Sequence, residues 1–325
     1  MPTKLKALLA TGRVSNLPTV WCNCLAAVLI LFHQSENGIH SYIQQPWNQS
    51  LTYLTIYLVF FSTCIYVGGC FMGDFHDRKF DALHKPDRPI PAGILSKNTV
   101  AGIGFSLLFF SILGAPIIPS LVLEHVRMNI MFLPVMFLVY SVNNYSQWHK
   151  KSLFIGLPLI GLCRFFLIIF AAAAASILLG KIEGSPGHER FHAVSYFILP
   201  IIIYAAAVCI YTIAFASVAR TESSDSPITW RNLLRYTMLA LPLTVLFTNQ
   251  SLQIETITAL VIYALWLSYA FSFLSKNKGN YVSKCLAGFC LLDACFLAQF
   301  GWIWVVICLI LFLLALALQK IAPAT

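Results

Sequence analysis

The sequence predicts an all-α membrane protein, a bundle of nine or ten transmembrane helices. Of its 325 residues, 59% are hydrophobic and only 10% are charged, and the mean hydropathy is +0.79. A soluble domain usually carries about 25% charged residues, so in water most of this apolar surface would lack polar cover. The bilayer is therefore the predicted solvent.

Apolar stretches long enough to cross about 30 Å at 1.5 Å per residue follow one another along the chain. They cover 15–33, 51–72, 98–118, 128–146, 153–179, 194–219, 231–250 and 254–274. A last stretch, 285–318, is either one tilted helix or two short helices broken at Gln299-Phe300-Gly301. No soluble domain or linker interrupts this pattern, so we expect residues 1–325 to form a single transmembrane domain.

The positive charges predict the orientation of the chain. Sixteen of the 21 Lys and Arg residues lie in the N-terminal segment or in loops on its side, whereas the opposite loops hold only Arg127, Lys181 and Arg190. This split predicts a multi-pass protein with a cytoplasmic N-terminus and cytoplasmic even-numbered loops. We expect the membrane to be a bacterial cell membrane. The formal net charge of +9 is spread over these loops, so the basic face that would bind nucleic acid is not expected.

An acidic segment follows the second apolar stretch. Asp74, Asp77 and Asp81 are spaced at i, i+3 and i+7, so on a continuing helix they would fall within roughly 60° of one face. Three carboxylates that close repel one another unless a cation neutralises them, and hard oxygen ligands suit Mg²⁺. The alternative is a solvated helix end in which neighbouring Arg and Lys side chains balance the charge.

The next segment is Lys85-Pro86-Asp87-Arg88-Pro89-Ile90-Pro91-Ala92-Gly93. Proline fixes φ and disfavours helix, so the chain should turn back here and hold Lys85 and Arg88 over the acidic face. Carboxylates for a metal beside cations for phosphate oxygens form a diphosphate site. No role is assigned to the three histidines on this side, His76, His84 and His149.

In these segments the chain resembles the UbiA-type intramembrane prenyltransferases. The aspartate pattern from Asp74 to Asp81, followed by Lys-Pro-Asp-Arg-Pro-Ile-Pro-x-Gly, is similar to the first signature of that family. The segment from Arg13 to Asn23 is similar to the family's first helix. Gly161-Leu-Cys163-Arg164 and Arg220-Thr-Glu222 are similar to its EboC-like branch.

The resemblance implies a helical bundle around a central cavity. It also implies transfer of an isoprenoid from its diphosphate to a lipophilic, often aromatic, acceptor in the membrane, with Mg²⁺ as the cofactor. The metal ligands and catalytic residues would be Asp74, Asp77 and Asp81. The residues that bind the diphosphate would be Lys85, Arg88 and Lys150 or Lys151.

Two features depart from the family's pattern. Gly73 stands where the first signature usually begins with Asn, and the second pair of aspartates is replaced by Arg220-Thr-Glu222-Ser-Ser-Asp225. Glu222 and Asp225 could share one helical face as further metal ligands. Arg220 could substitute for a metal as the counter-charge of the diphosphate.

Two charged residues lie deep inside apolar stretches. At 1.5 Å per residue, Arg164 and Asp293 lie about 16 Å and about 14 Å from the cytoplasmic ends of their stretches. Because an intramembrane charge is costly, we expect them to approach one another, or to share polar partners, near the floor of the cavity. Asn23 is a third polar residue expected there. Alternatively, each charge occupies a separate polar pocket for structural reasons.

Three functions fit these features. The first is Mg²⁺-dependent prenyl transfer from a polyprenyl diphosphate to a lipophilic acceptor. The second is an intramembrane terpene cyclase, in which the allylic cation reacts within its own chain. The third is a non-catalytic isoprenoid-binding or transport protein with the same fold. The intact carboxylates favour the two enzymes, whereas Gly73 and the altered second motif favour the third.

Overall fold

The computed structural model describes residues 3–33, 49–122, 129–150, 152–182, 189–221, 233, 236–247, 253–274 and 277–322. Its regular elements in these ranges are all helical, which confirms the predicted all-α class. In chain order they are α1 (Thr3–Thr11), η1 (Val14–Asn16), α2 (Leu17–His33), α4 (Gln49–His84), α5 (Lys97–Val122), α6 (Asn129–Trp148), α7 (Leu153–Ile182), α8 (Glu189–Thr221), η2 (Leu241–Phe247), α10 (Ile254–Phe271), α11 (Lys278–Leu297), η3 (Ala298–Phe300) and α12 (Trp302–Gln319).

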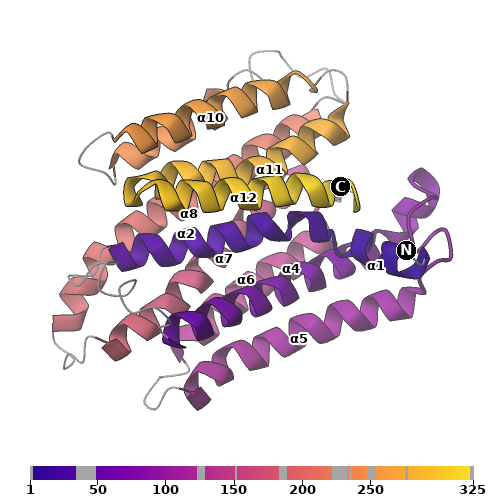
Figure 1. The fold of residues 1–325 in the computed structure, drawn as a ribbon. Helices are drawn as coiled ribbons and strands as arrows, with labels where there is room; N and C mark the ends of the chain where they lie inside the picture. Colours follow the sequence, from indigo (N-terminus) through magenta and orange to yellow (C-terminus); the bar gives the residue numbers. More distant parts are fainter. Residues whose placement is uncertain are drawn as a thin grey trace.

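Eight helices in the described part of the chain are long and apolar enough to cross a membrane. In Figure 1 the helices lie side by side, with α5 at one edge, α10 at the opposite edge and both termini at the same end. The spanning segments of α2 and α11 are 83% and 78% buried, against 28% for α5 and for α10. The protein is therefore an integral membrane protein with α2 and α11 at its centre.

The last apolar stretch is two helices. α11 ends at Leu297, the short turn η3 follows, and α12 begins at Trp302. The break falls on Gly301, whose φ of 108° and ψ of 169° lie in a region that only glycine adopts readily. The second helix brings the C-terminus back to the end of the bundle that holds the N-terminus (Figure 1). The two-helix alternative is thus confirmed.

The structure describes nearly all of one further expected span, 128–146, but only part of another, 231–250. α6, from Asn129 to Trp148, corresponds to the stretch expected at 128–146, whose first residue lies outside the described ranges. The stretch expected at 231–250 lies partly outside the described residues. Its described part is helical at 236–240 and continues as the 3-10 helix η2.

α4 and α6 are tightly packed at Gly69. A methyl group at this position would overlap Cγ1 of Val142 on α6. Valine is stiff at χ1 in a helix, so the two helices would have to move apart in Gly69→Ala. We expect this variant to lose about 1–3 kcal/mol of unfolding free energy, measured by unfolding in mixed detergent micelles.

Gly102→Ala is the matched control for this prediction. Nothing lies within 4 Å of a Cβ at Gly102 on α5, and alanine favours a helix over glycine by up to about 1 kcal/mol. The control should therefore be neutral or slightly stabilised. Equal losses in both variants would contradict the close approach of α4 and α6.

Candidate active site

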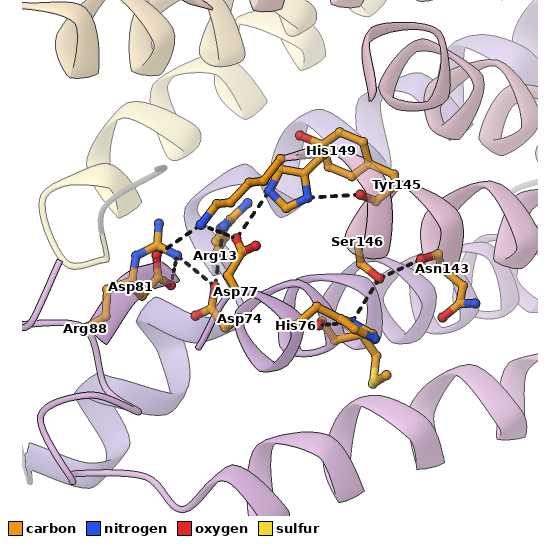
Figure 2. A network of polar contacts seen from close by, with 12 residues as sticks. Arg13, Asp74, His76, Asp77, Asp81, Arg88, Asn143, Tyr145, Ser146 and His149 are labelled. Atoms are coloured by element: carbon orange, nitrogen blue, oxygen red, sulfur yellow. Dashed lines mark hydrogen bonds and ion pairs between the residues drawn. The ribbon is translucent and has the colours of Figure 1, made fainter. Parts of the chain in front are cut away.

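The three aspartates lie on one buried face at the end of α4. The helix continues to His84, past the apolar part of the span. Asp74, Asp77 and Asp81 are 8%, 6% and 1% exposed. Carboxylates with so little exposure to water must be matched by nearby positive charge or by a metal ion. Four basic side chains, brought from three other segments, provide the positive charge (Figure 2).

Arg88 comes from the loop that follows α4. Its Nη1 lies 3.2 Å from Asp74 Oδ1 and 3.0 Å from Asp81 Oδ2, so one guanidinium bridges two carboxylates. The loop is held compact by backbone hydrogen bonds, including two from residues 94 and 95 to the Pro89 carbonyl, and by the buried side chain of Leu95. The expected turn back toward the acidic face is present, and it positions Arg88.

Lys150 comes from the segment after α6. Its Nζ lies 2.9 Å from Asp77 Oδ2 and 3.1 Å from Asp81 Oδ1. The same ammonium lies 4.0 Å from the centre of the Phe80 ring, which adds a cation–π contact. Lys150 therefore bridges the second and third carboxylates, as Arg88 bridges the first and third.

Arg13 is a third cation at the site, and the sequence did not predict it there. Its Nη2 lies 3.5 Å from Asp74 Oδ1. Arg13 has a φ of 45°, the only positive φ of a non-glycine residue in the described ranges, and such strain is concentrated at functional sites. Burial acts to lower the pKa of its guanidinium, but acidic neighbours that include Asp74 raise that pKa overall. Arg13 therefore stays charged.

His149 is a further site residue that the sequence pattern did not predict. Its Nε2 lies 3.2 Å from Asp77 Oδ2, and its Nδ1 lies 3.0 Å from the Tyr145 carbonyl oxygen. His76 and His84 bond through Nδ1 to the carbonyl four residues earlier in the same way, but neither forms an ion pair with an aspartate among the described residues. The one available signal was the position of His149 directly before Lys150 at a helix end.

Lys85 differs from Arg88 in its environment. Its side chain is exposed for the most part and forms no ion pair with the residues that the structure describes. Partial burial and the positive charge of Arg88 lower the pKa of its ammonium. The structure therefore brings Arg88, but not Lys85, against the aspartates.

The expected second half of the site lies mostly outside the described residues. The backbone of Arg220 belongs to the last turn of α8. Glu222 and Asp225 follow it in a stretch that the structure does not describe, and Lys151 also lies outside the described residues.

The donor atoms of the aspartates allow a test of the expected metal. Within the described ranges, no group of three or more His, Cys, Asp and Glu side chains is arranged to hold a metal ion. Each aspartate is engaged by basic side chains, yet Asp74 Oδ2 and Asp77 Oδ1 have no partner among the described residues. Mg²⁺ typically takes one or two carboxylates, with waters and substrate phosphates completing its shell. These two oxygens fit that requirement.

A second polar cluster lies inside the bundle and joins the two buried charges through Asn23. The Asn23 amide nitrogen donates to both carboxylate oxygens of Asp293 at 2.9 Å, and its oxygen accepts from Arg164 Nη1 at 2.8 Å. Arg164 also donates to Thr19 Oγ1 at 3.0 Å, and Tyr204 donates to Asp293 at 2.7 Å. Arg164 and Asp293 therefore share a polar partner, as expected, and the cluster connects α2, α7, α8 and α11.

The chain is similar to known proteins in sequence and in fold. The model of the UbiA prenyltransferase family matches residues 39–286. A digeranylgeranylglyceryl phosphate synthase of Korarchaeum cryptofilum (strain OPF8) is 31% identical over 118 residues. That alignment spans 36% of this chain and 39% of the synthase.

One solved structure has a similar arrangement of helices. It is described as "Structural and mechanistic insights into the biosynthesis of Digeranylgeranylglyceryl phosphate synthase in membranes". The TM-score is 0.54 at 18% identity, over 91% of this chain and 97% of that chain. At this identity the likeness shows a shared fold, and it confirms the predicted membrane helical bundle.

Proposed function

The chain belongs to the UbiA prenyltransferase family, and on this premise we propose that it transfers a prenyl group from a polyprenyl diphosphate to a lipophilic acceptor, with Mg²⁺ as cofactor. One observation carries the proposal. Three buried carboxylates on one face of α4 are matched by cations from three other segments. Carboxylates suit Mg²⁺ and the cations suit phosphate oxygens.

The reaction explains why both kinds of group are needed. The bond between C1 of the prenyl chain and the diphosphate oxygen breaks, and C1 joins a nucleophilic atom of the acceptor, which loses a proton. The leaving diphosphate takes the bonding electrons, so donors placed in advance lower the barrier. We propose that Arg13, Arg88 and Lys150 turn from the aspartates toward the diphosphate oxygens when the substrate binds.

Asp74 and Asp77 are the proposed metal ligands, since each has a carboxylate oxygen free of described partners. When bound there, Mg²⁺ would neutralise part of the diphosphate charge. Asp81 contacts both Arg88 and Lys150 and is proposed to orient these two cations. In this proposal the metal would bind to Asp74 Oδ2 and Asp77 Oδ1, the two carboxylate oxygens that the ion pairs leave available.

The remaining site residues complete the proposal. Lys85 would bind the diphosphate from the rim of the site. Near the end of α8, Glu222 and Asp225 would add metal ligands, and Arg220 would add positive charge. Asn23, Arg164 and Asp293 would form the polar floor of the central cavity that the family resemblance implies.

The proposed setting is a single domain over residues 1–325 in a bacterial cell membrane. The acidic end of α4 would face the cytoplasm, because sixteen basic residues lie on its side and three on the other. The diphosphate of a prenyl donor would then approach from water, while its chain enters from the lipid.

The candidate functions differ in the molecule that accepts the prenyl group. An aromatic, quinone-like acceptor is one candidate. A glyceryl phosphate lipid is another, since part of the chain is 31% identical to a digeranylgeranylglyceryl phosphate synthase. A terpene cyclase would need no acceptor, and a binding or transport protein would release no diphosphate.

The test is a reconstituted assay. The purified protein in vesicles is incubated with labelled geranyl, farnesyl or geranylgeranyl diphosphate, with Mg²⁺ or with EDTA. Membrane lipid extract and geranylgeranylglyceryl phosphate serve as separate acceptors. We expect diphosphate release and a prenylated product with Mg²⁺, and neither with EDTA. A cyclic hydrocarbon without acceptor would support the cyclase, and binding without turnover for every donor and acceptor would support the transport protein.

A further inference from the structure

A hollow of about 500 Å³ lies between the first turns of α11 and the last turns of α12. None of the residues proposed for prenyl transfer lines it. Both helix ends belong to the end of the bundle where the termini meet (Figure 1). The hollow is therefore separate from the candidate active site, and it lies toward the same membrane surface.

Two lysines give the hollow its charge. Lys284 and Lys320 both line it, and neither forms an ion pair with any described residue. Lys284 is also held against α10 by Trp266. Trp266 Nε1 donates to the Lys284 carbonyl oxygen at 3.0 Å, and the Lys284 ammonium lies 5.5 Å from the centre of the Trp266 ring. Two unpaired ammonium groups around one hollow favour an anionic ligand.

The walls of the hollow change from polar to apolar along α12. Gln319 donates to the Ser283 carbonyl oxygen at 2.9 Å and closes the polar end. Leu313, Leu316 and Ala317 form the apolar wall. Leu313 is seven residues from Lys320, a rise of about 10 Å along the helix. Its side chain is 61% exposed, so within a membrane-spanning helix it would contact lipid.

This profile matches one class of molecule in a membrane. Tryptophan is enriched at the level of the lipid head groups, and Trp266 holds Lys284. Basic pockets between transmembrane helices on the cytoplasmic side bind anionic lipid head groups. We propose that the hollow binds an anionic phospholipid, with its phosphate between Lys284 and Lys320 and an acyl chain along Leu313 and Leu316.

Native mass spectrometry of the delipidated protein in a neutral detergent tests the proposal. Phosphatidylglycerol and phosphatidylcholine of equal chain length are added in parallel. Each of the two lysines contributes about 1 kcal/mol toward anionic lipid, so we expect a preference for phosphatidylglycerol of roughly thirtyfold. Lys284→Gln/Lys320→Gln should bind the two lipids equally.

Two further variants make the test specific. Ala317→Trp fills the apolar part of the hollow, so it should lose the bound lipid while keeping both lysines. Lys97→Gln removes an exposed lysine at the start of α5, which does not line the hollow, and it should bind as the wild type does. The midpoint of thermal unfolding confirms that each variant is folded.

Inorganic phosphate separates a lipid site from a simple phosphate site. We expect millimolar phosphate to leave the lipid bound, because the apolar wall adds affinity that the free ion lacks. The proposal is overturned if the double lysine variant keeps the wild-type preference. It is also overturned if phosphate displaces the lipid and Ala317→Trp has no effect. Prenyl transfer is measured separately, so failure of one proposal does not decide the other.

Discussion

Asp81→Ala is expected to reduce prenyl transfer by at least about 10²- to 10³-fold, the loss typical when a preorganised charged contact to a leaving group disappears. Asp81 is 1% exposed and contacts both Arg88 and Lys150. Without Asp81, Arg88 and Lys150 would no longer be held beside the place from which they turn toward the diphosphate. Asp77→Ala should have a similar effect, because it removes a proposed metal ligand together with the second contact of Lys150.

The measurement is the release of diphosphate from a labelled prenyl donor in vesicles. Asp87→Ala is the matched control, since Asp87 is an exposed carboxylate on the adjacent loop and forms no ion pair with a described residue. The control should keep wild-type activity. Both site variants should elute at the same volume as the wild type and unfold as it does, because the altered carboxylates lie at the end of α4 rather than in the centre of the bundle. Wild-type turnover in Asp81→Ala or Asp77→Ala would remove the assignment.

The acidic face could be predicted from the sequence because it depends on one helix alone. Once α4 continues past the membrane surface, the spacing of Asp74, Asp77 and Asp81 places them on one side whatever surrounds them. The same local reasoning correctly left two alternatives for the last stretch, since a glycine permits a break but does not require one. The backbone of Gly301 decides between them.

The positions of the basic side chains around the aspartates depend on tertiary structure, so the sequence predicted them less well. Arg13 and His149 are far from the aspartates in the sequence, and only the packing of their segments against α4 brings them there. Lys85 and Arg88 are three residues apart in one loop, yet only Arg88 reaches the carboxylates. The hydrogen bonds of the turn decide which side chain faces inward, and residue types alone do not contain that geometry.

Arg164→Met is expected to lower the unfolding free energy by about 3–5 kcal/mol, because it leaves Asp293 as an unmatched buried charge. Asp293→Asn should have a comparable effect by leaving Arg164 unmatched, although asparagine can still bond to Asn23 and Tyr204. Unfolding in mixed detergent micelles measures both losses. Asn144→Ala, which removes a single bond to the Tyr140 carbonyl near the surface of α6, is the control and should change stability by about 0.5–1.5 kcal/mol at most.

The double variant Arg164→Met/Asp293→Asn distinguishes one charge network from two separate polar pockets. If Asn23 couples the charges, removing both leaves neither unmatched, and the double variant should lose less than the sum of the single losses. We expect a coupling of about 0.5–3 kcal/mol, even though Arg164 and Asp293 have no direct contact in the structure. Asn23→Leu should then resemble the more damaging single variant, because it cuts the connection to both charges at once. Additive losses would instead mean that each charge is stabilised by its own partners, Thr19 for Arg164 and Tyr204 for Asp293.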